Sequence, residues 1–178
     1  DIYLFDQLLR GNLGQGARVL DAGCGSGRNL VHLLRAGFDV HAVDAHPDAP
    51  ICGCGLRGHL ESFSSGTGIE HFVADQLAAG RGSTLSARPS AREIAAAANA
   101  GDGLARAAYA RAGSYLGVGV ANYLHIFDPS IVIFGGGVSM SGDLLFQPFE
   151  VSLRERVFHP SYLDGLKIAR AELGDDGG

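Results

Sequence analysis

The chain has 178 residues, enough for one domain of ordinary size or slightly more, and its composition is 46% hydrophobic, enough for a buried core. The net charge of −5 argues against nucleic acid as the main partner, and no apolar run reaches the ~18 residues of a membrane span. Three cysteines, an odd number, favour reduced thiols or a metal over a disulfide framework. We therefore expect a cytoplasmic protein that binds small molecules; composition does not decide between a monomer and a homo-oligomer.

The first 48 residues predict a β-turn-α-β unit. In chain order the pattern predicts a helix over 1–10, a strand over 17–22 (ARVLDA), a glycine loop over 23–27 (GCGSG), a helix over 28–36 that Gly37 ends, and a strand over 39–44 (DVHAVD). This order is that of the opening of a Rossmann-like sheet. A glycine loop between strand and helix lets the backbone and the free N–H groups of the helix approach a ligand.

The same segment resembles the class I S-adenosylmethionine-dependent methyltransferases. Residues 19–27 (VLDAGCGSG) look like their first motif, and Asp44 looks like the acid that accepts hydrogen bonds from the ribose hydroxyls. The resemblance implies an S-adenosylmethionine site made by Asp21, Gly23, Gly25, Gly27 and Asp44. The alternative is a plain strand-turn-helix in which the glycines serve packing. The later strands and the methyl-acceptor site of such an enzyme do not follow Asp44.

The remainder of the chain alternates helices and strands. The pattern predicts a turn over 47–50, a cysteine-rich loop over 52–59, a helix from Leu60 to Ala79 broken at 64–68, a polar loop over 80–89, a helix over 91–100 behind the capping box Ser90–Glu93, a long helix over 104–127, a strand over 131–134 (IVIF), a helix over 144–157 and a strand over 166–173. Because IVIF is wholly apolar, we expect it to be buried on both faces. We expect Tyr109, Leu116, Val120 and Tyr123 of the long helix to face inward.

The stretch from Cys52 to Glu61 (CGCGLRGHLE) brings two thiols, an imidazole and a carboxylate together on a backbone rich in glycine. Together with residues 65–69 (SGTGI) and 128–137 (DPSIVIFGGG), it resembles the ROK (repressor, open reading frame, kinase) sugar kinases. The resemblance implies an α/β fold: residues 49–178 would be the C-terminal half of a ribonuclease H-like ATPase of the actin and hexokinase type. Residues 1–48 would be a separate, partial methyltransferase-like unit, joined to it near 44–51.

In ROK kinases the cysteine motif binds a structural zinc ion, which requires four nitrogen or sulfur ligands. Cys52 and Cys54 match two of the family's ligands, and His59 stands where the family has a third cysteine. The fourth ligand would be His41, at the family's spacing, or His46. The family has a glutamate three residues before this histidine, where the present chain has Phe38. The alternative is a turn that binds no metal.

The resemblance also assigns contacts to sugar and nucleotide. Glu61 matches a glutamate that binds the sugar, and a carboxylate can accept hydrogen bonds from two hydroxyl groups. Gly135, Gly136 and Gly137 match the turn that faces the adenosine of ATP, which binds with Mg²⁺. The alternatives are an acid that only stabilises the start of a helix and a plain glycine turn.

The family's first phosphate loop (D-x-G-x-T), its catalytic aspartate and its second phosphate loop (G-T-G-x-G) do not occur in residues 1–50. We therefore assign no catalytic residue. The sequence predicts a ROK sugar kinase, specific for a hexose such as glucose or an N-acetylhexosamine, that is inactive as these residues alone. The alternatives are part of a methyltransferase and a non-catalytic sugar-binding module. A ROK repressor is less favoured because no helix-turn-helix precedes the domain, and both ends predict a longer parent protein.

Overall fold

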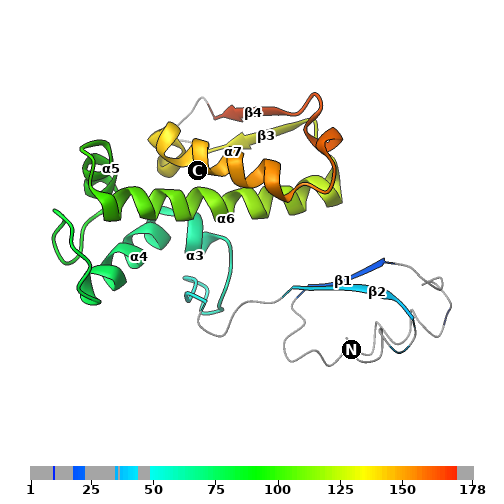
Figure 1. The fold of residues 1–178 in the computed structure, drawn as a ribbon, viewed down its shortest axis with the longest axis horizontal. Helices are drawn as coiled ribbons and strands as arrows, with labels where there is room; N and C mark the ends of the chain where they lie inside the picture. Colours follow the sequence, from blue (N-terminus) through cyan, green and yellow to red (C-terminus); the bar gives the residue numbers. More distant parts are fainter. Residues whose placement is uncertain (1–9, 11–17, 23–34, 36, 44–48, 172–178) are drawn as a thin grey trace. The chain divides into compact units, whose positions relative to one another are not determined.

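The computed structural model describes residues 10, 18–22, 35, 37–43 and 49–171, and the chain divides into two compact units, residues 1–49 and 50–178 (Figure 1). The helices predicted over 1–10 and 28–36, the glycine loop with Gly23, Gly25 and Gly27, and the residues Asp44 and His46 lie outside the described residues, apart from Arg10 and Arg35. No helix of the described segments is both long enough and apolar enough to cross a membrane.

In the first unit, β1 (Arg18–Ala22) and β2 (Asp39–Val43) pair in parallel, with Arg18 opposite Asp39 and Ala22 opposite Val43. The two predicted strands are confirmed. Gly37 enters β2 with a φ of +81°, a left-handed conformation that glycine adopts without strain. The Rossmann-like identity of this unit stays a prediction.

The second unit is mainly helical. Its elements are α3 (Glu61–Ser64), α4 (Gly66–Ala78), α5 (Ala91–Asn99), α6 (Gly103–Phe127), β3 (Ile131–Phe134), the 3₁₀ helix η1 (Gly137–Ser141), α7 (Asp143–Arg156), the 3₁₀ helix η2 (Pro160–Leu163) and β4 (Lys167–Arg170), with β3 and β4 parallel. The predicted helices and strands of this unit are therefore confirmed to within a few residues.

Side-chain caps explain where several helices begin. Ser65 accepts a hydrogen bond from the backbone N–H of Gly68 at 3.1 Å, and Ser90 and Glu93 form the predicted capping box at the start of α5. Asp102 caps α6 through the N–H groups of Leu104 and Ala105, at 3.0 and 2.9 Å. Its other carboxylate oxygen accepts hydrogen bonds from the loop before α5, including the N–H of Thr84 at 2.7 Å. These donors lower the pKa of Asp102 well below its ordinary value.

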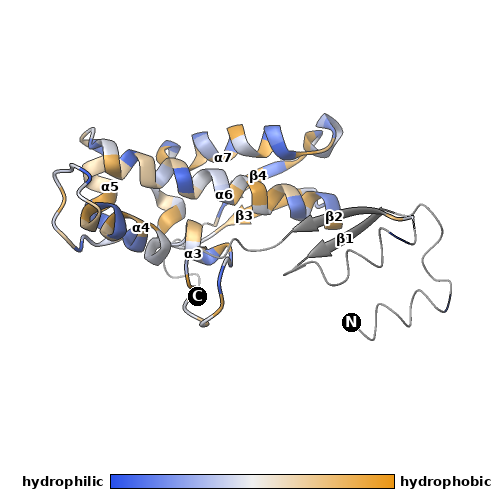
Figure 2. Ribbon diagram, turned by 60° about the horizontal axis from the view of Figure 1, so that its bottom comes forward, coloured by the Kyte–Doolittle hydropathy of each residue, from blue (hydrophilic) through white to orange (hydrophobic). Residues whose placement is uncertain are grey.

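The core of this unit has two clusters along α6: α4, α5 and Leu145 of α7 pack on its first half, and α7, which lies beside α6 (Figure 1), packs with β3 on its second half. Both helices carry polar as well as apolar residues (Figure 2). Tyr109 and Val120 face inward, as predicted, and Leu116 is partly buried. Glycine makes this close approach possible: a Cβ at Gly117 would lie 2.6 Å from the Cβ of Ser152 and 2.8 Å from the carbonyl oxygen of Phe149.

Two predictions about burial are wrong. Ile131 and Ile133 of β3 are 44% and 60% exposed, because in the described residues β3 pairs only with β4 and only the face with Val132 and Phe134 packs on the core. Tyr123 is 53% exposed, because the buried face of α6 at this end consists of Val120, Ala121 and Leu124. The ring of Tyr123 lies outside this face, beside the ring of Phe127.

Candidate functional site

The cysteine-rich segment folds into a tight turn ahead of α3. The backbone N–H of Cys52 donates to the carbonyl of Leu56 at 2.8 Å, and that of Gly55 donates to the carbonyl of Cys52 at 2.9 Å. Gly55 and Gly58 have φ values of +88° and +78°, which favour glycine at both positions. The turn therefore depends on these glycines and folds the chain back so that residues at its two ends meet.

Cys52, Cys54 and His59 meet inside this turn, and their ligand atoms all lie within 4.8 Å of one another. The Sγ of Cys54 lies 3.2 Å from the Nδ1 of His59. Cys52 is buried, whereas Cys54 and His59 are exposed. Two thiols and an imidazole are ligands that zinc prefers. Zinc lies about 2.0–2.3 Å from such ligand atoms, so ligand atoms that share one ion are less than 4.8 Å apart, as these three are. These three residues therefore fit one side of a zinc site.

The fourth ligand remains a prediction. His41 lies on β2, in the other unit, and His46 lies outside the described residues. The three groups of the turn are the metal-ligating cluster found in the described part of the chain.

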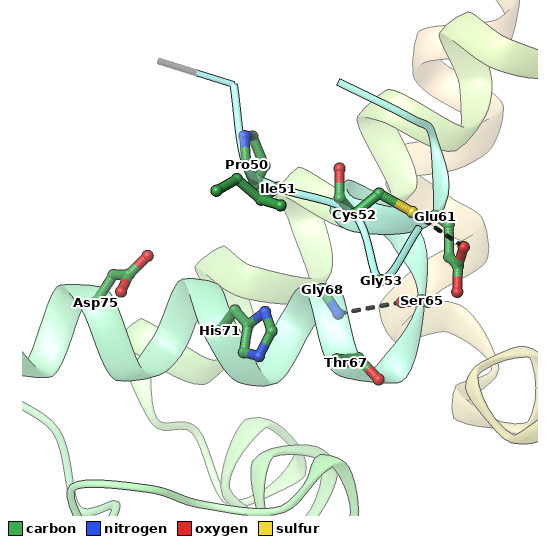
Figure 3. A pocket seen from close by; sticks show the side chains of 11 residues that line it. Pro50, Ile51, Cys52, Gly53, Glu61, Ser65, Thr67, Gly68, His71 and Asp75 are labelled. Atoms are coloured by element: carbon green, nitrogen blue, oxygen red, sulfur yellow. Dashed lines mark hydrogen bonds between the residues drawn. The ribbon is translucent and has the colours of Figure 1, made fainter. Parts of the chain in front are cut away.

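Glu61 is the first residue of α3, directly after the turn. Its Oε2 accepts a hydrogen bond from the Sγ of Cys52 at 3.3 Å (Figure 3). The pKa of Cys52 is raised: the backbone hydrogen bond from Cys54 lowers it, but the bond to Glu61, burial and the neighbouring thiol together outweigh that contribution. The cysteine turn therefore holds the carboxylate that the sequence predicts to contact sugar.

A pocket of about 500 Å³ opens between this turn and α4, and both Cys52 and Glu61 line it (Figure 3). Its polar lining is completed by Ser62, Ser65, Thr67, His71 and Asp75. A pocket of this size accommodates a small molecule of the size of a hexose. The arrangement offers two carboxylates, an imidazole and several hydroxyl groups to a ligand rich in hydroxyls.

Sequence reasoning missed Thr67, His71 and Asp75. These residues follow one another at intervals of four on α4, so they share one helical face, and that face lines the pocket (Figure 3). Their spacing was the signal that could have identified them.

The predicted nucleotide glycines follow β3 as expected. Gly136 has a φ of +79°, and its carbonyl oxygen accepts hydrogen bonds from the backbone N–H and the hydroxyl of Ser139, at 3.1 and 2.7 Å. Gly137 begins η1, and a Cβ at Gly136 would meet no atom within 4 Å. The turn thus leaves open space over bare backbone, and contact with a nucleotide stays a prediction.

Comparison with known proteins decides the family. The sequence model of the ROK family matches residues 23–178. The chain belongs to the ROK family. The match begins at Gly23, so it includes the loop and second strand that resemble the methyltransferase motif, and the comparisons lend no support to a methyltransferase unit or to S-adenosylmethionine as a cofactor.

Its ROK relatives include kinases and regulators. The glucokinase of Thermotoga maritima is 35% identical over 151 residues, which are 80% of this chain and 46% of that protein. The structure of a ROK family glucokinase from Streptomyces griseus in complex with glucose and AMPPNP is similar with a TM-score of 0.62 and 28% identity, over 74% of this chain and 45% of that one.

A ROK family transcriptional regulator, a homologue of the Escherichia coli MLC protein, is similar with a TM-score of 0.60 and 32% identity, over 70% of this chain and 32% of that one. The chain therefore has the α/β structure of ROK proteins and spans about half the length of the kinases it matches.

Proposed function

We propose that this chain is the sugar-binding half of a ROK hexose kinase, which would use ATP and Mg²⁺, and that these 178 residues alone do not phosphorylate sugar. The observation that carries the proposal is the position of Glu61, which follows the cysteine turn directly as the first residue of α3 and lines a pocket of hexose size. Similarity to glucokinases supports the choice of a hexose, glucose or an N-acetylhexosamine.

The chemistry available in the described residues is binding, not transfer. Glu61 accepts hydrogen bonds from two sugar hydroxyls, and Thr67 and His71 offer further polar contacts from α4. Gly135, Gly136 and Gly137 would leave room for the adenosine of ATP. Phosphoryl transfer also needs phosphate-binding groups, a metal ion and a base for the sugar hydroxyl, and the motifs that supply them in the family do not occur in residues 1–50.

Zinc would have a structural role. Cys52, Cys54 and His59 would hold the ion, and the ion would fix the turn that precedes Glu61.

Calorimetric titration with glucose and N-acetylglucosamine tests the binding part of the proposal. We expect weak but saturable binding that Glu61→Gln reduces about tenfold, the loss of one hydrogen bond to a charged group. Glu150→Gln is the matched control, because Glu150 is an exposed carboxylate on α7 that does not line the pocket. Equal loss in both variants, or no binding of either sugar, would contradict a sugar site at Glu61.

A coupled ADP-release assay with the same sugars tests the second part. We expect no sugar-dependent release of ADP above background. Turnover near an ordinary kcat, on the order of 10 s⁻¹, would show that the chain contains a complete catalytic site.

A further inference from the structure

A second cavity, of about 350 Å³, lies between α6 and α7 and shares no lining residue with the Glu61 pocket. Its polar lining consists of Arg111, Ser114 and Tyr115 from α6 and Ser152, Glu155 and Arg156 from α7. Cavities that hold small ligands start at about 300 Å³, so this one has room for a small ligand. The function proposed above does not use it.

Arg111 is the most confined charge of this cavity. Its guanidinium carbon lies 4.9, 4.7 and 5.2 Å from the ring centroids of Phe63, Phe72 and Tyr115. Burial lowers the pKa of Arg111. The three rings stabilise the cation, and its N–H groups donate to no described residue, so they are available to an anion.

Neither arginine of this cavity has an ionic partner in the described chain: Arg111 and Arg156 make no ion pair with any described carboxylate. By contrast, Arg154, two residues before Arg156 on α7, pairs with Glu150 at 3.7 Å and does not line the cavity. Arg111 is partly buried yet has no ion pair, although a partly desolvated cation is normally paired; Arg156 is exposed and adds a second positive charge, and Glu155 is the one carboxylate in the lining.

We propose that this cavity between α6 and α7 binds a phosphate group, with Arg111 and Arg156 as its charged contacts and the hydroxyls of Ser114 and Tyr115 as further donors. The two guanidinium groups outnumber the one carboxylate of the lining, and the fork of N–H donors on each matches the oxygen geometry of a phosphate. The hydroxyl of Ser152 is already used, because it donates to the carbonyl of Ser114 at 2.7 Å.

Glu155 makes a specific prediction possible. Its carboxylate lines the same cavity and repels an anion, so removing its charge should strengthen phosphate binding. If the two arginines had only a structural role, removing the charge of Glu155 would not change the affinity for phosphate. Arg156 is also favoured as a cation at the end of α7 by the helix dipole, which by itself requires no ligand.

The test is calorimetric titration at constant ionic strength, in the Glu61→Gln protein, in which sugar binding at the other pocket is expected to be about tenfold weaker. The ligands are inorganic phosphate, glucose 6-phosphate and, as a control, glucose. We expect Arg156→Ala to weaken phosphate binding about tenfold or more, Arg154→Ala to leave it within about twofold, and Glu155→Gln to strengthen it about threefold. Arg156, Arg154 and Glu155 are exposed, so these variants do not disturb the core.

The outcomes separate clearly. No heat with either phosphate compound, or an equal loss in Arg156→Ala and Arg154→Ala, would overturn the proposal. Tighter binding of glucose 6-phosphate than of inorganic phosphate would support it and identify an organic phosphate as the ligand. Equal binding of the two would support it with the phosphate group alone as the recognised feature. A loss of glucose binding in Arg156→Ala as large as the loss of phosphate binding would overturn it, because the affinity of this cavity would then not depend on phosphate.

Discussion

Gly117 offers the sharpest test of the packing between α6 and α7. In Gly117→Ala the new Cβ would lie 2.6 Å from the Cβ of Ser152 and 2.8 Å from both the backbone N of Leu153 and the carbonyl oxygen of Phe149. Ordinary contacts begin at 3.4 Å, so α7 would have to move by about 0.8 Å (3.4 − 2.6). Because backbone atoms cannot rotate away, the overpacking should cost about 3 kcal/mol.

The substitution also brings a gain, because alanine is favoured over glycine within a helix by about 1 kcal/mol. The net effect should therefore be a loss of about 2 kcal/mol, which corresponds to a Tm lower by about 4–8 °C for a chain of this length. Thermal unfolding followed by circular dichroism measures it.

Gly103→Ala is the matched control on the same helix, because a Cβ there meets nothing within 4 Å. It should leave Tm unchanged or raise it slightly. Gly119→Ala is an intermediate case: its Cβ would meet the Cδ2 of Leu60 at 2.5 Å, the end of a flexible side chain that can move aside. A Tm of Gly117→Ala equal to or above that of Gly103→Ala would refute the close approach of the two helices.

Three further predictions concern caps, pH and metal. Asp102→Ala should lower the free energy of unfolding by about 2 kcal/mol, measured by urea denaturation, because it removes the cap of α6 and the hydrogen bonds from Thr84. Burial lowers the pKa of His125, whose Nε2 accepts a hydrogen bond from the N–H of Phe158 at 3.1 Å, so stability should fall as the pH drops below about 6.5 and less so in His125→Phe. Protein purified without added zinc should contain about one zinc per chain by metal analysis, and Cys54→Ser should lose it.

The sign of the His125 prediction follows from proton binding. A folded state that keeps the imidazole neutral binds fewer protons than the unfolded chain near and below pH 6.5, so acid favours unfolding. An unchanged pH dependence in His125→Phe would contradict it. For Asp102, a loss no larger than that of an exposed alanine substitution would contradict the cap, and for zinc, a chelator that leaves Tm unchanged would contradict the metal site.

Local signals in the sequence predicted the secondary structure of the second unit well. The Ser90–Glu93 box, the Ala-rich run of α6 and the apolar IVIF segment each encode one element through neighbouring residues, and the structure confirms each element. What failed was burial. A wholly apolar strand predicts that other elements cover both of its faces, but it does not show whether those elements belong to the same chain. In the described residues, no element covers the face of β3 that carries Ile131 and Ile133.

At the candidate site, too, local features were predicted from the sequence, whereas contacts between elements were not. The turn and the meeting of Cys52, Cys54 and His59 followed from the spacing and from the glycines. The bond from Cys52 to Glu61 did not, because it depends on how the turn enters α3. The Arg111 cluster was missed because its rings come from different helices.

The β3–β4 pair has a consequence for handling the protein in solution. In the described residues each of these strands has one neighbour, so each leaves a row of backbone N–H and C=O groups free to pair with another chain. Beside one such edge, Ile131 and Ile133 present apolar surface to water. Natural edge strands discourage this kind of stacking with charged side chains, and on β3 no position carries one. Association through β3 should therefore limit the solubility of these 178 residues. The substitution Ile133→Lys should raise the highest concentration at which the protein remains monomeric and in solution.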